Sequence, residues 1–236
     1  INLDDGDADD VGGYLGKLVA RSGEPVIRQA MIQAMKILGR QFVMGRTIQE
    51  ALERARDAEK GSYRHSYDML GEAARTDADA LRYFDAYAAA IDTIGEESRG
   101  LGPIDAPGIS VKLSALHPRY ELAQRDRVMT ELLGRIRELA VMAKRADIGL
   151  TIDAEEADRL DISLDVLEAL SGDPALKGWN GLGLAVQAYQ KRAYAVLQWL
   201  AETAEQHDRK WMVRLVKGAY WDTEIKHAQE LGMDGY

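Results

Sequence analysis

Hydrophobic positions in the first quarter of the chain recur at the spacing of an amphipathic helix. One such stretch covers residues 25–43 and predicts a first helix. A second begins at Thr47, an N-cap residue with Glu50 three positions further on, and ends at Gly61. No strand pattern interrupts this part, so we expect residues 1–61 to form an acidic lead and a helical arm.

After residue 61 the pattern changes to short apolar runs of strand type that alternate with amphipathic stretches. The expected strands cover residues 63–70, 109–116, 148–153, 182–188 and 211–217. The expected helices between them cover residues 77–94, 126–145, 163–170 and 193–206. This alternation is typical of βαβ units and a parallel sheet, so the fold class is α/β. A doubly wound sheet and a barrel both fit it.

Polar side chains near the C-terminal ends of the last four expected strands favour the barrel. In strand order they are Lys112, Asp153, Gln187, and the pair Arg214 and Lys217. Parallel barrels build their active sites at this end of the strands. We therefore expect residues 62–236 to form the first part of a (β/α)8 TIM-type barrel, with about five of its eight strands.

These polar groups also admit a structural interpretation. Lys112 and Asp153 could form an ion pair that joins two strands, and Gln187 could cap a loop backbone. Four consecutive strands that all end in buried polar groups favour a ligand, because such burial is costly without one. Lys217 has the opposite strand alternation to Arg214, so the two should point apart unless Gly218 distorts the strand end.

Composition narrows the functional classes. Hydrophobic residues make up 46% and charged residues 29% of the chain, as in ordinary globular proteins. The net charge of -9 argues against nucleic-acid contact, because phosphate binding needs a basic surface. No apolar run is long enough to predict a membrane span. The chain has no cysteine and its four histidines are scattered, so we expect no metal site despite the acidic run of Asp153, Glu155, Glu156 and Asp158.

Five segments, in this order, resemble the proline dehydrogenase domain of bacterial proline utilization A. They are Ser66–Ala73, Ser110–Tyr120, Ile152–Glu156, Val186–Arg192 and Arg214–Trp221. The resemblance covers roughly residues 25–236. It implies a distorted (β/α)8 barrel that binds FAD and oxidises L-proline to Δ1-pyrroline-5-carboxylate, with a membrane quinone as electron acceptor. It also implies an adjoining aldehyde dehydrogenase domain, a cytoplasmic location that can include the inner membrane surface, and compatibility with a homo-oligomer.

The resemblance also assigns roles to individual positions. Lys112 matches the residue that meets the proline carboxylate, Asp153 an active-site carboxylate near flavin and substrate, and Arg214 an arginine beside the flavin N5. Asp68 matches a supporting acid. Further cofactor contacts are implied for Asp153, Gln187, Val216, Lys217, Gly218 and Trp221. The wall against the proline ring is implied to include Leu215, Ala219 and Tyr220.

The remaining segments of that family hold an arginine pair for the substrate carboxylate, a tyrosine over the substrate, and contacts to the FAD phosphates. We expect these to lie outside this sequence, together with the N-terminal DNA-binding domain that some members carry. Two other functions stay open. One is a Schiff-base aldolase on the same barrel, with Lys112 or Lys217 as nucleophile. The other is a non-catalytic interaction module.

Overall fold

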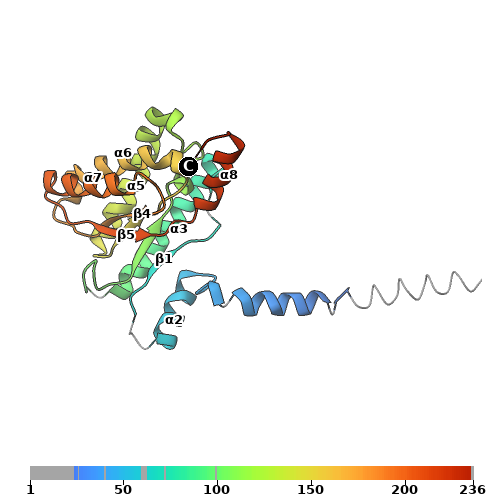
Figure 1. Cartoon of the computed structure of the whole chain (residues 1–236). Coiled ribbons are helices and arrows are strands. Elements are labelled where there is room, and N and C mark those ends of the chain that lie inside the picture. Colours follow the sequence, from blue (N-terminus) through green and yellow to red (C-terminus); the bar gives the residue numbers. More distant parts are fainter. Residues whose placement is uncertain are drawn as a thin grey trace, which may run out of the picture. The chain divides into compact units, whose positions relative to one another are not determined.

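The computed structural model describes residues 24–25, 27–39, 41–59, 63–71, 73–98 and 100–234 (Figure 1). The chain divides into two compact units, residues 1–58 and residues 59–236. Parts of the expected acidic lead and first helix, residues 1–23, 26 and 40, lie outside the described residues, as do residues 60–62.

Most of the described residues of the smaller unit are helical. Residues 27–39 form a helix, and α2 (Ile48–Glu59) follows. The Oγ1 atom of Thr47 accepts a hydrogen bond from the Glu50 N–H at 3.2 Å. The Glu50 carboxylate reaches back to the N–H of Arg46 at 2.8 Å. This reciprocal pattern satisfies backbone donors at the start of α2, as the sequence predicted for Thr47 and Glu50.

The larger unit contains one parallel sheet among its described residues. Its strands are β1 (Ser66–Asp68), β2 (Gly108–Val111), β3 (Leu150–Ile152), β4 (Leu182–Gln187) and β5 (Met212–Val216). Each strand pairs in parallel with the next one along the chain, in the order β1-β2-β3-β4-β5. A doubly wound sheet would reverse this order at a switch point. The sheet is therefore part of a (β/α) barrel, and the barrel interpretation is confirmed.

The long helices cover one face of this sheet (Figure 1). They are α3 (Asp77–Ser98), α5 (Arg125–Arg145), α6 (Leu160–Ser171) and α7 (Ala193–Gln206). The residues of β2, β3 and β4 that point toward the helices are apolar and buried. They form two rows across the strands: Ile109, Leu150 and Leu182 in one, and Val111, Ile152 and Leu184 in the other. The core thus lies between sheet and helices. Burial of about 1.5–3 kcal/mol per large apolar side chain stabilises it.

The other face of the sheet carries small and polar residues. Ser66 and Ser110 join β1 to β2 across this face through their hydroxyl groups at 3.0 Å. On β4, a Cβ atom built on Gly183 would lie 2.3 Å from the backbone oxygen of Met212, so only glycine allows β5 to approach. Lys112, Asp153 and Gln187 lie on this face, at the carboxyl ends of the strands.

One local prediction was wrong, and one helix was not predicted. The expected strand over residues 109–116 ends at Val111, and residues Leu113–Leu116 form the short helix α4. The chain turns because the N–H of Ala115 bonds to the Lys112 oxygen at 3.1 Å instead of extending the ladder. Helix α8 (Trp221–Glu230) was missed, although Asp222 and Glu224 in its first turn suit a helix N-terminus. Short 3-10 helices also occur: η1 (Leu122–Gln124), η2 (Ala157–Arg159) and η3 (Pro174–Leu176).

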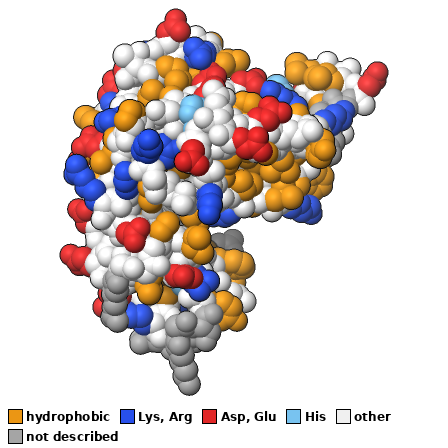
Figure 2. Space-filling view, turned by 90° about the vertical axis from the view of Figure 1, so that its left-hand side faces the viewer, with side chains coloured by type: hydrophobic (Ala, Val, Ile, Leu, Met, Phe, Trp, Pro, Cys, Tyr) orange, Lys and Arg blue, Asp and Glu red, His pale blue; other side chains and the backbone are white. Residues whose placement is uncertain are grey.

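The open sheet leaves apolar surface exposed. The edge strand β5 exposes Val213 by 39% and Leu215 by 60%. Figure 2 shows hydrophobic side chains gathered on one side of the larger unit, among charged groups that are spread more evenly. Within the described part of the chain, none of the helices combines the length and the apolar character that a membrane crossing requires.

Candidate active site at the carboxyl ends of the strands

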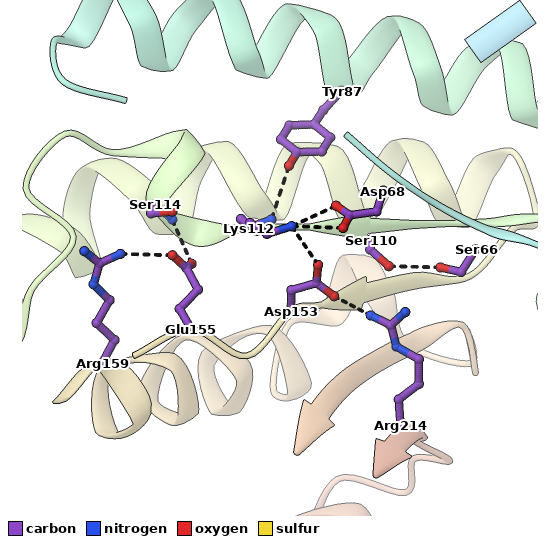
Figure 3. A network of polar contacts seen from close by, with 10 residues as sticks. All are labelled: Ser66, Asp68, Tyr87, Ser110, Lys112, Ser114, Asp153, Glu155, Arg159 and Arg214. Atoms are coloured by element: carbon purple, nitrogen blue, oxygen red, sulfur yellow. Dashed lines mark hydrogen bonds and ion pairs between the residues drawn. The ribbon is translucent and has the colours of Figure 1, made fainter. Parts of the chain in front are cut away.

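Four charged side chains form a continuous chain of ion pairs at the carboxyl ends of the strands (Figure 3). The Lys112 Nζ atom lies 2.8 Å and 3.1 Å from the two carboxylate oxygens of Asp68. The same atom lies 3.1 Å from Oδ2 of Asp153. The other oxygen of Asp153, Oδ1, accepts a hydrogen bond from Nη2 of Arg214. Asp68 and Arg214 lie on β1 and β5, whereas Lys112 and Asp153 directly follow β2 and β3.

The local backbone explains how these side chains converge. Asp153 directly follows β3, and its N–H still bonds to the Val111 oxygen at 2.9 Å. Lys112 directly follows β2 and is the N-cap of α4. Its N–H bonds to the hydroxyl oxygen of the buried Tyr87 on α3 at 3.2 Å. Both site residues are thus held at the point where their strands end.

Asp153 is the most buried member of the chain of ion pairs. Its side chain is 13% exposed, compared with 23% for Lys112 and 39% for Arg214. Burial raises the pKa of the Asp153 carboxyl, while Lys112 and Arg214 oppose this change. The Asp153 carboxyl group therefore lies in a partly desolvated place beside two cations, which is a common property of functional groups.

A second polar cluster surrounds Glu155, two residues beyond Asp153. One oxygen of its carboxylate accepts the Ser114 N–H at 3.0 Å, and the other accepts Nη1 of Arg159 at 2.9 Å. Its backbone oxygen accepts Nε2 of Gln187 at 2.8 Å. Burial raises the pKa of the Glu155 carboxyl, and the hydrogen bond from Ser114 opposes it. Gln187 does cap a loop backbone, as the structural interpretation predicted.

The buried polar atoms of this region without a hydrogen-bond partner in the described structure include Oε1 of Gln187 and Nε of Arg214. Gln187 is only 4% exposed. A buried acceptor and a buried donor without partners are costly, so a bound polar group would satisfy them. A cavity of about 20 Å³ adjoins Asp153, Glu155 and Gln187. A larger hollow of about 670 Å³ lies around Arg137 between α5 and α6, but none of its lining residues carries such an atom, so we place the site at the strand ends.

The turn between β5 and α8 closes one side of the site. The Val216 and Lys217 oxygens accept the N–H groups of Ala188 and Tyr189 at 2.8 Å and 3.2 Å. Gly218 has φ of 116°, a conformation that L side chains rarely adopt. A Cβ atom there would also lie 2.3 Å from the Tyr189 ring.

The structure brings together Lys112, Asp153, Gln187 and Arg214. The other predicted residues do not join this cluster. Strand pairing puts Arg214 beside Ala185 and Leu215 beside Val186, so Leu215 alternates to the opposite face from Arg214. The Lys217 Nζ atom lies 5.7 Å from the centre of the Trp221 ring, at the start of α8. Ala219 is exposed and Tyr220 is half-buried, with burial raising the Tyr220 pKa.

Sequence reasoning missed Tyr87 and Arg159 and treated Glu155 only as a possible metal ligand. Tyr87 occupies an apolar stripe of α3, where nothing in the pattern distinguishes it from a core residue. Arg159 stands four residues after Glu155 on the chain, and this spacing was an available signal. In the described part of the chain, no three His, Asp or Glu side chains gather as the ligands of a metal ion would.

The fold and the site together define an α/β-barrel protein with a carboxylate–cation cluster at the carboxyl ends of its strands. The family model described as "Proline dehydrogenase" matches residues 51–236. The chain therefore belongs to the proline dehydrogenase family.

Several relatives of the chain are bifunctional proteins of much greater length. The "Bifunctional protein PutA" of Salmonella typhimurium is 55% identical over 222 residues, which are 94% of this chain and 17% of that protein. A crystal structure of Bradyrhizobium japonicum proline utilization A matches with 60% identity and a TM-score of 0.78, over 94% of this chain and 23% of the other. A Bdellovibrio bacteriovorus structure, 24% identical, shows the same fold with a TM-score of 0.82, over 88% of this chain and 23% of that one.

One expectation is overturned by these comparisons. A second family model, described as the "DNA-binding domain of Proline dehydrogenase", matches residues 2–42, against the expectation that any such domain lies outside this sequence. Residues 2–42 contain five Lys or Arg and six Asp or Glu, a net charge of -1, so most of the whole-chain charge of -9 lies outside the matched range. The described residues of this match, 24–25, 27–39 and 41–42, are helical.

Proposed function

We propose that this chain forms the first part of a FAD-dependent barrel that oxidises L-proline to Δ1-pyrroline-5-carboxylate. One observation carries the proposal: in a member of the proline dehydrogenase family, the Lys112–Asp153–Arg214 chain stands beside two unpartnered buried polar atoms. This arrangement lies where barrel enzymes hold substrate and cofactor.

Each charged residue has a role that suits the reaction. Proline carries a carboxylate, and Lys112 is the cation that would bind it, exchanging part of its contact with Asp68. Asp153 holds Lys112 and Arg214 in fixed directions through its two oxygens. A fixed substrate orientation matters because the carbon–hydrogen bond next to the nitrogen must face the electron acceptor.

The residues present fit a flavin. Arg214 offers an unpartnered N–H donor and Gln187 an unpartnered acceptor, and the flavin ring system presents both acceptors and an N–H donor. Val216, Lys217, Gly218 and Trp221 would contact the cofactor from the β5–α8 turn, and Asp153 from β3. FAD would supply the acceptor for the two electrons that leave proline. Tyr220 and Ala219 would line the substrate side and limit the access of water. Leu215, the third predicted wall residue, alternates to the opposite face of β5 from Arg214, so we do not place it against the substrate.

Residues outside this sequence would complete the site. Strands β1 and β5 each pair on one side only among the described strands, so the barrel needs further strands to close. We propose that these come with the aldehyde dehydrogenase domain that proline utilization A proteins carry. A quinone would receive the electrons, which fits a protein in the cytoplasm that reaches the inner membrane surface and assembles as a homo-oligomer.

The visible absorption spectrum tests the proposal. We expect the chain together with the strands that complete the barrel to be yellow, to retain FAD and to reduce it with proline. We expect the 236 residues alone to bind FAD weakly and to aggregate, because the exposed edge of β5 lacks a partner. A completed protein without flavin absorption, or one whose flavin proline does not reduce, would overturn the proposal.

The contacts of Lys112 argue against a Schiff-base aldolase. A lysine nucleophile reacts as the neutral amine, whereas Asp68 and Asp153 both bind the Lys112 ammonium. Lys217 lies against Trp221 rather than in the chain of ion pairs. Borohydride trapping with a carbonyl substrate would reveal an aldolase. A colourless protein inside a stable complex would favour the interaction module.

A further inference from the structure

Glu155 is a buried acid that the proposed reaction does not use. Its side chain is only 5% exposed and lies in the loop between β3 and η2. The carboxylate bonds to the Ser114 N–H at the start of α4 and to the Arg159 guanidinium in η2. One side chain thus ties this loop to two neighbouring elements, and Figure 3 shows it between Ser114 and Arg159.

The same residue determines the orientation of the Gln187 amide. The Glu155 backbone oxygen lies 2.8 Å from Nε2 of Gln187. A carbonyl oxygen only accepts hydrogen bonds, so the amide must present its nitrogen to Glu155 and its oxygen to the opposite side. That oxygen is the buried Oε1 atom without a partner. It lies on the side of Gly218, since a Cβ atom built there would be 3.1 Å from it.

We propose that Glu155 is a positioning residue that holds the Gln187 amide as a hydrogen-bond acceptor toward the cofactor. The inference rests on the proposed function. An oxidised isoalloxazine ring carries one N–H group, at N3. Gln187 Oε1 would therefore accept a hydrogen bond from N3–H. By holding the amide in this orientation, Glu155 would favour a flavin whose ring edge donates a hydrogen bond.

The neighbouring acid Glu156 provides a matched control. It is half-buried, and its carboxylate lies 3.3 Å from Nε of Arg159. The contacts described for Glu156 do not include Gln187. Replacing Glu156 with Gln therefore changes the same charge on the same loop without releasing the amide of Gln187.

The experiment measures dissociation constants for FAD and for FAD methylated at N3, in the protein that contains this chain and the strands that complete the barrel. Flavin fluorescence and the visible spectrum provide the signal. The variants are Glu155→Ala, Glu155→Gln, Gln187→Met and the control Glu156→Gln. Circular dichroism checks that each variant folds. Gln187→Met removes both amide atoms and defines complete loss of the contact.

We expect the unmodified protein and Glu156→Gln to prefer FAD over the methylated form by about tenfold, the equivalent of one hydrogen bond. Glu155→Ala and Gln187→Met should reduce this preference to about twofold or less. Glu155→Gln can still accept the Ser114 N–H, so it should give an intermediate preference. This variant keeps the test valid if Glu155→Ala does not fold. If Glu155→Ala or Glu155→Gln weakens both ligands equally, Glu155 only stabilises the fold and the inference is wrong. If the unmodified protein binds neither ligand, the proposed function itself fails.

Discussion

Replacing Lys112 with Met separates a substrate-binding role from a structural ion pair. The change keeps most of the aliphatic stem and removes the ammonium group, which lies within 3.1 Å of both Asp68 and Asp153. In the substrate-binding interpretation, a proline carboxylate loses a charge-assisted hydrogen bond worth about 1.5–3 kcal/mol. This corresponds to an increase of about 10- to 150-fold in the dissociation constant of a carboxylate ligand.

The variant also has a cost in stability that is shared by both interpretations. Lys112 is 23% exposed and Asp68 is 40% exposed, so their pairing is screened by solvent. The loss of unfolding free energy should be roughly 1–2 kcal/mol, between the values for exposed and buried pairs. Lys144→Met is a suitable control because its ammonium group bonds only to the backbone oxygens of Ala175 and Lys177 in the described contacts.

The assay is inhibition of proline oxidation by two ring-matched ligands, a proline analogue with a carboxylate and the corresponding carboxamide. Lys112→Met should raise the inhibition constant of the carboxylate strongly and that of the carboxamide by less than about threefold. Lys144→Met should lower stability and leave both constants unchanged. If Lys112→Met moves the two constants equally, the lysine does not recognise the carboxylate and the structural ion pair is the better explanation.

Two further predictions concern other parts of the site. Asp153→Ala and Arg214→Met should each lower the proline turnover number by about 100-fold or more. Each should reduce the free energy of unfolding by only about 1–3 kcal/mol. Unchanged turnover with flavin still bound would contradict their role. Glu155→Gln should make stability less sensitive to pH. Because burial raises the folded-state pKa of Glu155 above 4.5, this group's contribution to stability falls as the pH rises through and above that value. Urea unfolding from pH 4 to 7 should show the variant gaining on the unmodified protein toward neutral pH; parallel curves would refute this.

The alternation of strands and helices could be predicted because it depends on local periodicity. The helix expected over residues 193–206 is α7 as found, and the strand expected over 182–188 ends one residue earlier. The strand expected over 109–116 failed because an apolar run does not show where a ladder stops. Its second half is buried as α4 rather than as strand. Periodicity cannot distinguish these two ways of burying Leu113, Ala115 and Leu116.

The charged members of the site could also be predicted, but their contacts could not. Lys112, Asp153 and Arg214 were conspicuous because charge interrupts an apolar strand. The supporting role of Tyr87 could not be seen, since its hydroxyl group meets Lys112 only after α3 has packed against β2. The orientation of Gln187 likewise depends on a backbone oxygen 32 positions away in the chain. Such contacts follow from the fold, and no local pattern encodes them.

From the charges of the site we expect this chain alone to bind proline poorly. Lys112 and Arg214 provide two positive charges, and Asp68 and Asp153 provide two negative charges that already contact them. A substrate carboxylate that entered this neutral cluster would compete with both acids for the same cations. It would also lose water on entry, which costs several kcal/mol unless new partners replace the water. Binding therefore requires further positive charge from outside the described strands, and the open edges beside β1 and β5 are where that charge can be supplied.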